Sequence, residues 1–326
     1  MLIARTPLRM SFFGGGTDFP QFFVKHGGAV LGTAIDKYIY HCVTEFPSRL
    51  FDYSIRLAYR KVECVRSLDE IEHRPFREVL RFLNIERDVE ISLAADLPSS
   101  SGLGSSSSFT VGLINALMAF KGRFISQTEL ANLAVHIERN ILKEDVGCQD
   151  QVLAAYGGLN IVRFIRDDHF VVHRVTMSNA RQRELCDSLL MFFTGITRPA
   201  GNIEKRKLEN LSNIQENLKR MLNLVDKAHG ILTGNEPLSA FGALLDRTWQ
   251  EKRLLATGVS NPVIDRMYQD GRAAGALGGK LLGAGGGGFL LFFVPQENQP
   301  AVRNALANYY EIPFSINASG SGIIHS

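Results

Sequence analysis

The sequence predicts an α+β fold with two domains, and three observations lead to this expectation. The chain has 326 residues, which is more than one hydrophobic core usually serves. Stretches typical of strands and of helices follow one another without the regular alternation of parallel α/β proteins. A polar stretch rich in Ser, Asn, Arg and Gln at residues 176–188 interrupts the apolar pattern. We therefore expect a first domain over residues 1–175 and a second over residues 185–326.

The first domain is expected to hold most of the strands. β-Branched and aromatic residues in partial alternation predict strands at residues 1–6, 29–46, 55–65, 89–93, 159–164 and 170–175, the last two as a hairpin. The glycine-rich segment Gly14–Pro20 is expected to be a turn or loop. Ser126 and Glu129 have the spacing of a capping box, which predicts the start of a helix that carries Glu138. Further helices are expected at residues 75–84, 109–120 and 149–156.

The second domain is expected to be rich in helices. One long charged helix is predicted over residues 203–232, and shorter ones over residues 237–255, 262–274 and 300–309. Two strands are predicted, at residues 189–194 and 289–294. The second of these strands follows the glycine-rich segment at residues 278–288.

Composition excludes several classes of protein. The net charge is +3 without a Lys- or Arg-rich tract, so we expect no nucleic-acid partner. The four cysteines lie far apart without a C-x-x-C pair, which argues against a disulfide framework and a zinc site. No leader peptide and no apolar stretch of membrane-spanning length stands out, so we expect a cytoplasmic protein without a membrane partner. The oligomeric state stays open, a homo-oligomer included.

The segment Pro98–Ser108 says most about function. It is rich in Gly and Ser and opens the apolar, helix-like run Phe109–Phe120. Backbone N–H groups of such a loop can point at one spot, and the helix start adds partial positive charge there. Serine hydroxyls add hydrogen-bond donors or a ligand for a metal ion. The pattern therefore indicates a cradle for a polyphosphate, and the alternative is a loop that caps the helix without any ligand.

Three glycine-rich segments in this order, at residues 14–18, 98–108 and 280–288, resemble the kinases of the GHMP family. The resemblance covers nearly the whole chain, and its most specific part is Pro-x3-Gly-Leu-Gly-Ser-Ser at Pro98–Ser106. It implies a first domain like domain 2 of ribosomal protein S5, a ferredoxin-like second domain and an active site between them. ATP and Mg²⁺ are the cofactors that it implies.

The stretches Arg5–Asp18 and Gln149–Asn160 look most like one branch of this family. That branch phosphorylates the anomeric hydroxyl of D-glycero-D-manno-heptose 7-phosphate to the 1,7-bisphosphate, for surface polysaccharide. Three alternatives stay open: another sugar 1-kinase of the galactokinase or fucokinase type, a regulator that binds sugar or ATP without catalysis, and an RNA-binding module of the S5 type.

The resemblance assigns the nucleotide and metal sites. ATP is expected at Pro98, Ser100, Ser101, Gly102, Leu103, Gly104, Ser105, Ser106 and Ser107. Mg²⁺ is expected on Ser106 and Glu138, because hard metals prefer oxygen ligands and Mg²⁺ beside ATP takes one or two from the protein. The alternative for Glu138 is a solvated side chain that pairs with Arg139 or Lys143.

Asp150 is the expected catalytic base, because a carboxylate within hydrogen-bond reach can accept the proton of a sugar hydroxyl. Its alternative role is to cap the following helix. Arg9 resembles the basic residue that galactokinase-type enzymes place beside their Asp, where it would stabilise the carboxylate and the transferred phosphoryl group. Its alternative is an exposed strand end. Many relatives have Lys where this chain has Cys148.

The acceptor is expected to contact the first and third glycine-rich segments. Gly16, Thr17 and Asp18 are expected to bind sugar hydroxyls, and the alternative is an Asx turn. Gly285 and Gly286 are expected in the far wall of the site, and the alternative is a hairpin without ligand contact. A phosphate on the acceptor needs a cation, for which Arg198 is the candidate and Lys25 its rival.

Overall fold

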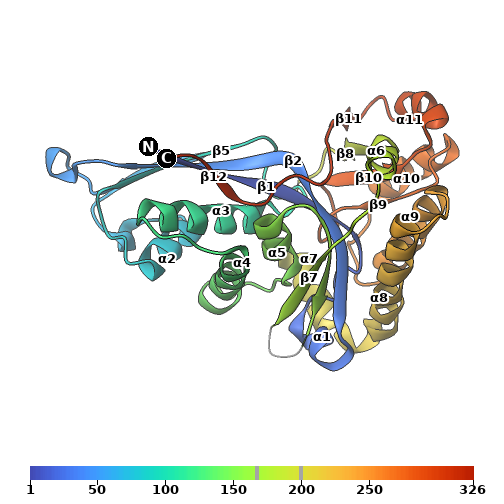
Figure 1. Cartoon of the computed structure of the whole chain (residues 1–326), viewed down its shortest axis with the longest axis horizontal. Coiled ribbons are helices and arrows are strands. Elements are labelled where there is room, and N and C mark those ends of the chain that lie inside the picture. Colours follow the sequence, from blue (N-terminus) through green and yellow to red (C-terminus); the bar gives the residue numbers. More distant parts are fainter. Residues whose placement is uncertain (166–168, 198–200) are drawn as a thin grey trace.

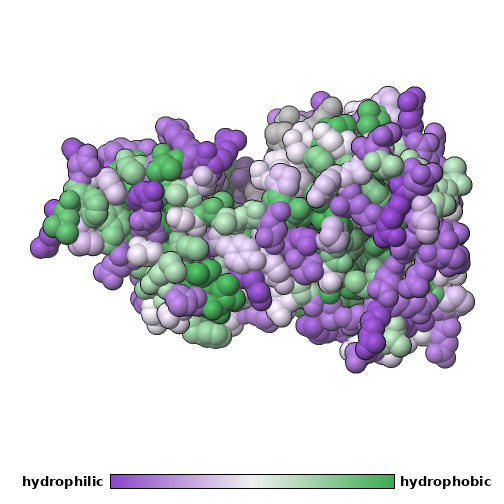
Figure 2. All heavy atoms as spheres, turned by 90° about the horizontal axis from the view of Figure 1, so that it is seen from above, coloured by the Kyte–Doolittle hydropathy of each residue, from purple (hydrophilic) through white to green (hydrophobic). Residues whose placement is uncertain are grey.

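The computed structural model describes residues 1–165, 169–197 and 201–326 (Figure 1). The chain forms two lobes, which Figure 2 shows from above with a narrower middle between them. A large sheet with helices beneath it makes one lobe, and a smaller sheet with long helices beside it makes the other.

Eight strands of the described residues form the large sheet, in the order β12-β1-β2-β5-β3-β4, with β6 and β7 continuing from one half of β2. Their bounds are β1 Leu2–Phe13, β2 Gly28–Glu45, β3 Ile55–Ala58, β4 Val62–Val65, β5 Val89–Ala95, β6 Leu159–Phe164, β7 Phe170–Arg174 and β12 Gly322–His325. All neighbours are antiparallel except β3 and β5.

The long strands β1 and β2 carry this lobe. Residues 28–33 of β2 pair with β6, whereas residues 39–45 pair with β5, so β2 serves two different partners along its length. The sequence-based expectation of a short first strand over residues 1–6 is wrong, because β1 continues to Phe13. From Thr6 onward every residue of β1 is buried, so the alternation that marks a half-exposed strand is lost.

Helices cover one face of the large sheet (Figure 1). They are α2 Arg74–Phe82, α3 Ser105–Phe120, α4 Gln127–His136 and α5 Gln149–Tyr156. The expected capping box is confirmed, since Ser126 accepts from the Glu129 backbone and Glu129 accepts from the Ser126 backbone. Glu138 lies just beyond α4, in a single π-helical turn at Ile137–Ile141. Short α1 spans Pro20–His26.

The smaller sheet has the order β11-β8-β10-β9, and all of its pairs are antiparallel. Its strands are β8 Leu189–Phe193, β9 Gly278–Leu281, β10 Phe289–Phe293 and β11 Tyr310–Glu311. Numbered along the chain this order is 4-1-3-2, with helices between the first two strands and between the last two. That is the ferredoxin-like arrangement that the family resemblance implies.

Helices of the second lobe are α6 Asn179–Asp187, α7 Gly201–Glu209, α8 Leu211–Thr233, α9 Ser239–Arg253, α10 Pro262–Ala273 and α11 Gln299–Ala305. The expectation of one helix over residues 203–232 is wrong. The helix is interrupted at Asn210, so α7 and α8 are separate helices. α7 contributes side chains to the cleft described below.

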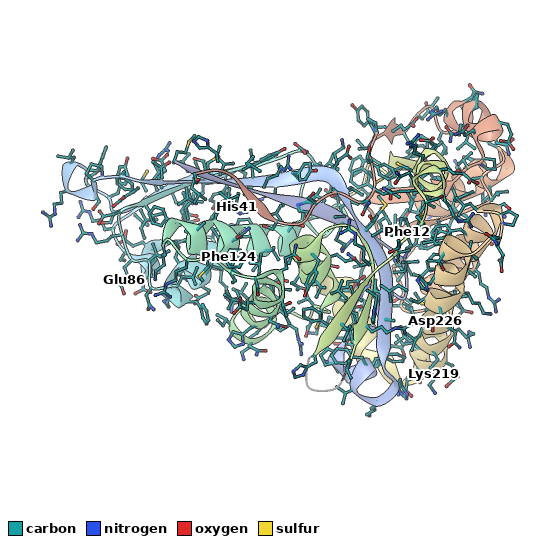
Figure 3. The ribbon with its side chains drawn as sticks, viewed as in Figure 1. Phe12, His41, Glu86, Phe124, Lys219 and Asp226 are labelled. Carbon is teal, nitrogen blue, oxygen red and sulfur yellow. The ribbon has the colours of Figure 1, made fainter. Side chains whose placement is uncertain are left out.

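Aromatic packing joins the two lobes. Phe12 and Phe13 of β1 both meet Phe241 of α9 edge to face, with ring centroids 5.4 and 5.1 Å apart (Figure 3 labels Phe12). The division expected near residues 175–185 separates the two sheets, but β12 returns to pair with β1. Within the described part of the chain no helix is long and apolar enough to cross a membrane.

Candidate active site

A cleft of about 820 Å³ lies between the lobes. One wall comes from β1 and the starts of α3 and α5, and the other from α7, α9 and the loop after β9. The cleft therefore brings together all three glycine-rich segments of the sequence. The sequence-predicted residues that line it are Arg9, Gly16, Asp18, Ser100, Gly102, Gly104, Ser105, Ser106, Ser107, Asp150 and Gly285.

The serine-rich loop ends at Gly104, immediately before α3. Gly104 has a φ of 71°, in the left-handed region, and a Cβ there would lie 2.8 Å from Arg9 Nε. Both facts require glycine. The first backbone N–H groups of a helix have no helical partner, and the helix dipole adds positive charge there. The start of α3 in the cleft is therefore suited to bind phosphate.

Three residues that were expected to bind ATP do not line the cleft: Pro98, Ser101 and Leu103. The Ser101 hydroxyl donates to the Pro98 carbonyl at 2.7 Å. Leu103 is fully buried in the core, and its carbonyl accepts from the Arg9 backbone N–H at 3.0 Å. These three residues therefore hold the loop in its conformation, and neighbouring residues of the loop line the cleft.

Arg9 and Asp150 form a forked ion pair inside the cleft. Arg9 Nε donates to Asp150 Oδ1 at 2.7 Å and Nη2 donates to Oδ2 at 2.5 Å. The third nitrogen, Nη1, donates to the Gly102 carbonyl at 2.9 Å. Arg9 is 5% exposed, whereas the Asp150 side chain keeps 26% of its surface open. Arg9 thus fixes the carboxylate and the phosphate loop relative to each other, and the carboxylate remains reachable from the cleft.

Glu138 lies fully buried behind this wall. Its Oε2 accepts from the Ser107 hydroxyl at 2.9 Å and from Gln151 Nε2 at 2.6 Å. Oε1 is buried without a hydrogen-bond partner among the described residues. Burial raises the pKa of Glu138 to about 7, although the nearby hydroxyls of Thr110 and Ser107 and the Gln151 amide lower it. A partnerless carboxylate oxygen next to the serine loop fits a hard cation such as Mg²⁺.

The serine that contacts Glu138 is Ser107, whereas the expected metal ligand Ser106 is exposed at the cleft. No group of three His, Cys, Asp or Glu side chains that could hold a metal gathers in the described ranges. Any Mg²⁺ here would therefore take most of its ligands from phosphate oxygens and water, which is usual for Mg²⁺ beside a nucleotide.

Asp18 and Gln149 form a polar corner of the cleft. Asp18 Oδ1 accepts from the Gly16 backbone at 3.0 Å and from Gln149 Nε2 at 3.1 Å, and Oδ2 accepts from the Gln149 backbone at 3.2 Å. Asp18 is 1% exposed, and burial, together with the nearby Asp150 charge, raises its pKa to about 6. Behind this corner Arg139 Nη1 donates to Cys148 Sγ at 3.5 Å.

Two residues expected to bind the acceptor have other partners. The buried Thr17 hydroxyl donates to the carbonyls of Gly14 and Ala29 at 2.8 and 2.9 Å, so Thr17 holds the glycine loop in place. The Gly286 backbone N–H donates to the Val259 carbonyl at 2.9 Å, and Gly286 does not line the cleft. Thr17 and Gly286 therefore support the walls behind Gly16 and Gly285.

Neither of the two cations expected to bind a substrate phosphate is found in the described lining of the cleft. Arg198 lies outside the described residues, and Lys25 is exposed on α1 and does not line the cleft. Four lysines, none of them named as a candidate for the substrate phosphate, line the second lobe's wall instead: Lys205, Lys207, Lys252 and Lys280. Only Lys280 belonged to an expected segment, so distance along the chain hid this cluster from sequence reasoning.

Apolar residues line the first lobe's end of the cleft, next to the serine loop. They come from β2, β5 and the residues after it, the β3–β4 turn and the starts of α2 and α3, and comprise Ile39, Tyr59, Pro75, Leu93, Ala95, Leu97 and Phe109, with the polar His73 and Arg60 among them. Sequence reasoning missed all of them, because each reads as an ordinary core or strand residue. Together they offer a flat apolar space beside an anion site.

Comparison with known proteins agrees with this geometry. A model of the GHMP kinases N terminal domain matches residues 69–158, and a model of the GHMP kinases C terminal domain matches residues 228–312. The chain is 33% identical to D-glycero-alpha-D-manno-heptose 7-phosphate kinase of Campylobacter jejuni, over 93% of this chain and 92% of that protein. The chain belongs to the GHMP kinase family.

Solved structures of GHMP kinases share the whole fold. A D-glycero-D-manno-heptose 1-phosphate kinase from Bacteroides thetaiotaomicron matches with a TM-score of 0.80 at 25% identity, over 100% of both chains. Galactokinase of Lactococcus lactis matches with a TM-score of 0.75 at 18% identity, over 100% of this chain and 95% of that one, which shows the fold alone. The predicted α+β, two-domain GHMP kinase fold is confirmed.

As a GHMP kinase, the chain is an enzyme that transfers a phosphoryl group from ATP to an alcohol. The three glycine-rich segments on which the family resemblance rests are the three that meet at the cleft. The cleft between the lobes is therefore the candidate active site.

Proposed function

We propose that this enzyme phosphorylates the anomeric hydroxyl of D-glycero-D-manno-heptose 7-phosphate to give the 1,7-bisphosphate and ADP. The observation that carries the proposal is the forked Arg9–Asp150 pair beside the phosphate loop. It supplies a fixed carboxylate for an alcohol proton and a fixed cation for phosphoryl oxygens at one place. The product would serve the cytoplasmic synthesis of activated heptose for surface polysaccharide.

ATP enters this scheme through the first lobe. We place its triphosphate on the backbone N–H groups of Gly104–Ser107 at the start of α3, where the helix end favours negative charge. The apolar end of the cleft, lined by Tyr59 and Phe109 among others, suits the flat face of a base. The two placements agree, because the apolar end adjoins the serine loop in the same cleft.

Asp150 acts on the acceptor. Both of its oxygens already accept a bond from Arg9, and each keeps a further lone pair for the sugar hydroxyl. As the hydroxyl oxygen attacks the γ-phosphorus, its proton moves to the carboxylate. Arg9 is held by Asp150 and by the Gly102 carbonyl, so it can stabilise the phosphoryl oxygens without rearranging.

Ser106 and Glu138 would hold Mg²⁺, which would supply positive charge to the phosphate oxygens. Glu138 also connects two parts of the site through its own contacts. It accepts from Ser107 of α3 and from Gln151 of α5, the neighbour of Asp150. Glu138 thereby fixes the spacing between the phosphate loop and the catalytic helix.

The acceptor assignment draws on the relatives. The Campylobacter jejuni relative is named a heptose 7-phosphate kinase, whereas the Bacteroides structure is named a heptose 1-phosphate kinase. Both names describe a phosphorylated heptose and differ in the position of the phosphate. L-fucokinase/L-fucose-1-P guanylyltransferase of Bacteroides fragilis, 27% identical over 92% of this chain and 35% of that protein, favours a free sugar as the second candidate acceptor.

ADP release across a panel of acceptors tests the proposal. The panel holds heptose 7-phosphate, heptose 1-phosphate, free heptose, fucose and galactose, each with ATP and Mg²⁺. We expect the highest kcat/KM for heptose 7-phosphate. A higher kcat/KM for fucose or galactose would replace the acceptor by a free sugar, and the absence of ADP release with every acceptor would leave a binding protein of the same fold.

A further inference from the structure

Two buried lysines in the second lobe's wall have no role in the scheme above. Lys252 of α9 and Lys280 of β9 are 5% and 2% exposed, and both line the cleft. Lys252 Nζ donates to the carbonyls of Leu281 and Gly283 at 2.7 and 2.5 Å. Lys280 Nζ donates to the carbonyls of Ser11 and Phe12 at 2.7 and 2.9 Å.

These contacts leave both charges uncompensated. An ammonium group has three donors, and two neutral carbonyls use two of them, so one donor of each lysine is free. Among the described residues neither lysine forms an ion pair with a carboxylate, whereas Lys207 pairs with Glu204 at 3.0 Å and Arg9 pairs with Asp150. The carboxylate whose charge raises the pKa of Lys252 is that of Glu204, which already pairs with Lys207. Two neighbouring cations without a carboxylate of their own are costly in a buried wall.

The pKa values of both lysines agree with a site that binds an anion. Burial and then the Arg9 charge lower the pKa of Lys280 to about 7. Burial and then the Lys280 charge lower the pKa of Lys252 well below its ordinary value. A dianion in contact with both groups would restore their charge, and its oxygens would accept the two free N–H donors.

Lys280 lies next to the polar corner of the cleft, whereas Lys252 lies nearer the phosphate loop. The Gly283 that Lys252 binds packs against Gly102, since a Cβ on Gly283 would lie 2.4 Å from the Gly102 Cα. Lys280 binds the carbonyl of Ser11, and the Ser11 hydroxyl lies 3.5 Å from the place where a Cβ on Gly15 would be. The side-chain amide of Gln149 lies 3.8 Å from the same place and donates to Asp18. Lys280 therefore adjoins the polar corner of Asp18 and Gln149 through Ser11.

We propose that Lys252 and Lys280 form the subsite for the phosphate group that the acceptor already carries. The ligand class is a sugar phosphomonoester that carries its phosphate on another carbon than the hydroxyl that reacts at Asp150. The inference rests on the proposed function for the identity of the sugar. It adds the reason for selectivity, since a free sugar would leave two buried ammonium groups without an anion.

Lys252→Met and Lys280→Met test the subsite, with Lys219→Met as the matched control. Lys219 pairs with Glu216 on an exposed part of α8 and does not line the cleft (Figure 3 labels Lys219). We expect each cleft variant to raise the KM for heptose 7-phosphate by roughly 10- to 100-fold, the value of one charge-assisted hydrogen bond. In the cleft variants the ratio of kcat/KM for heptose 7-phosphate to that for free heptose should fall by the same factor, and the KM for ATP should stay unchanged. The Lys219→Met variant should keep the wild-type values of all these constants.

The other source of a phosphate is the transferred γ-phosphoryl group. If it occupied the lysine pair, both variants would lower kcat with phosphorylated and free heptose alike, or would raise the KM for ATP. Either result overturns the proposal.

An experiment on the wild-type enzyme needs no folded variant. Inorganic phosphate is added to assays with each acceptor. We expect it to compete with heptose 7-phosphate and to increase the rate with free heptose, because phosphate and free sugar fill the two halves of the site together. Competition of inorganic phosphate with ATP alone would overturn the proposal.

Failure of the proposed function is distinguishable from failure of the subsite. If the wild-type enzyme releases no ADP with either heptose, the assigned sugar is wrong. Calorimetry with inorganic phosphate then still decides the subsite. Weaker binding by Lys252→Met and Lys280→Met than by Lys219→Met supports it, and equal binding by all three overturns it.

Discussion

Arg9 of β1 and Asp150 of α5 meet through two nearly parallel hydrogen bonds, although 141 positions of sequence separate them. The third nitrogen of the same guanidinium holds the Gly102 carbonyl. One planar group therefore sets the distance between the base and the phosphate loop. A lysine carries the same charge but lacks the planar fork.

Arg9→Lys is expected to lower kcat by roughly 10- to 100-fold, which corresponds to one lost charge-assisted hydrogen bond. The ammonium reaches Asp150 or Gly102, but it does not reach both with the same geometry. Steady-state kinetics with saturating ATP and acceptor measures the effect. An unchanged kcat would show that the charge alone is sufficient.

Gly104→Ala is expected to lower kcat/KM for ATP, because the new Cβ would lie 2.8 Å from Arg9 Nε at the entrance of α3. Gly122 is the matched control. It has a similar φ of 67° after the other end of α3, and a Cβ there would meet nothing within 4 Å. Both variants bear the left-handed strain of about 1 kcal/mol, so equal losses of activity would contradict this role for Gly104.

Glu138→Gln is expected to change the pH dependence of stability in Mg²⁺-free buffer. The folded protein holds the Glu138 proton up to a pKa of about 7, whereas the unfolded chain loses it near its ordinary value of 4.5. In the wild-type protein Glu138 therefore contributes less to the free energy of unfolding as the pH rises from about 4.5 to about 7, by about 3 kcal/mol in total. Glutamine keeps an acceptor for Ser107 and does not ionise.

Urea unfolding at pH 5 and pH 8 measures this difference. Relative to wild type, the free energy of unfolding of Glu138→Gln should be higher at pH 8 than at pH 5. If the two proteins showed the same pH dependence of this free energy, a buried and titrating Glu138 would be contradicted. The same variant should need more Mg²⁺ for half-maximal rate if the carboxylate serves the metal.

Phe241→Ala is expected to lower the free energy of unfolding by about 3–5 kcal/mol, as for other buried aromatic residues. Phe241 packs against both Phe12 and Phe13, so its loss also weakens the contact between the lobes. Phe124 is the control, since it is 91% exposed (Figure 3), and Phe124→Ala should change stability by no more than about 0.5 kcal/mol. Chemical denaturation of wild type, Phe241→Ala and Phe124→Ala measures the two losses. Similar free energies of unfolding for the two variants would contradict this account.

Sequence reasoning reached the parts of the fold whose signal is local. The capping box at Ser126 and the helix behind the serine loop were predicted from neighbouring residues alone. β1 was predicted too short, because both of its faces are buried after Thr6. β12 was missed, since a short and partly exposed strand exists only through its distant partner β1.

The same distinction holds at the active site. Asp150 and Arg9 were expected from the family motifs, and the structure brings them into contact. Lys252 lies on α9 in an ordinary helical pattern. It is held at the cleft by the carbonyls of Leu281 and Gly283, which are distant in the sequence. Contacts that depend on the tertiary fold have no signature in a single sequence.

Asp150→Asn gives the most direct test of the central claim. The amide matches the carboxylate in shape but accepts no proton, so kcat should fall by roughly 10²- to 10⁴-fold. Phosphorus NMR of reactions with ATP and heptose 7-phosphate should show the 1,7-bisphosphate with the wild-type enzyme and almost none with the variant, while calorimetry shows ATP binding unchanged. Formation of the bisphosphate by Asp150→Asn at the wild-type rate would contradict the account.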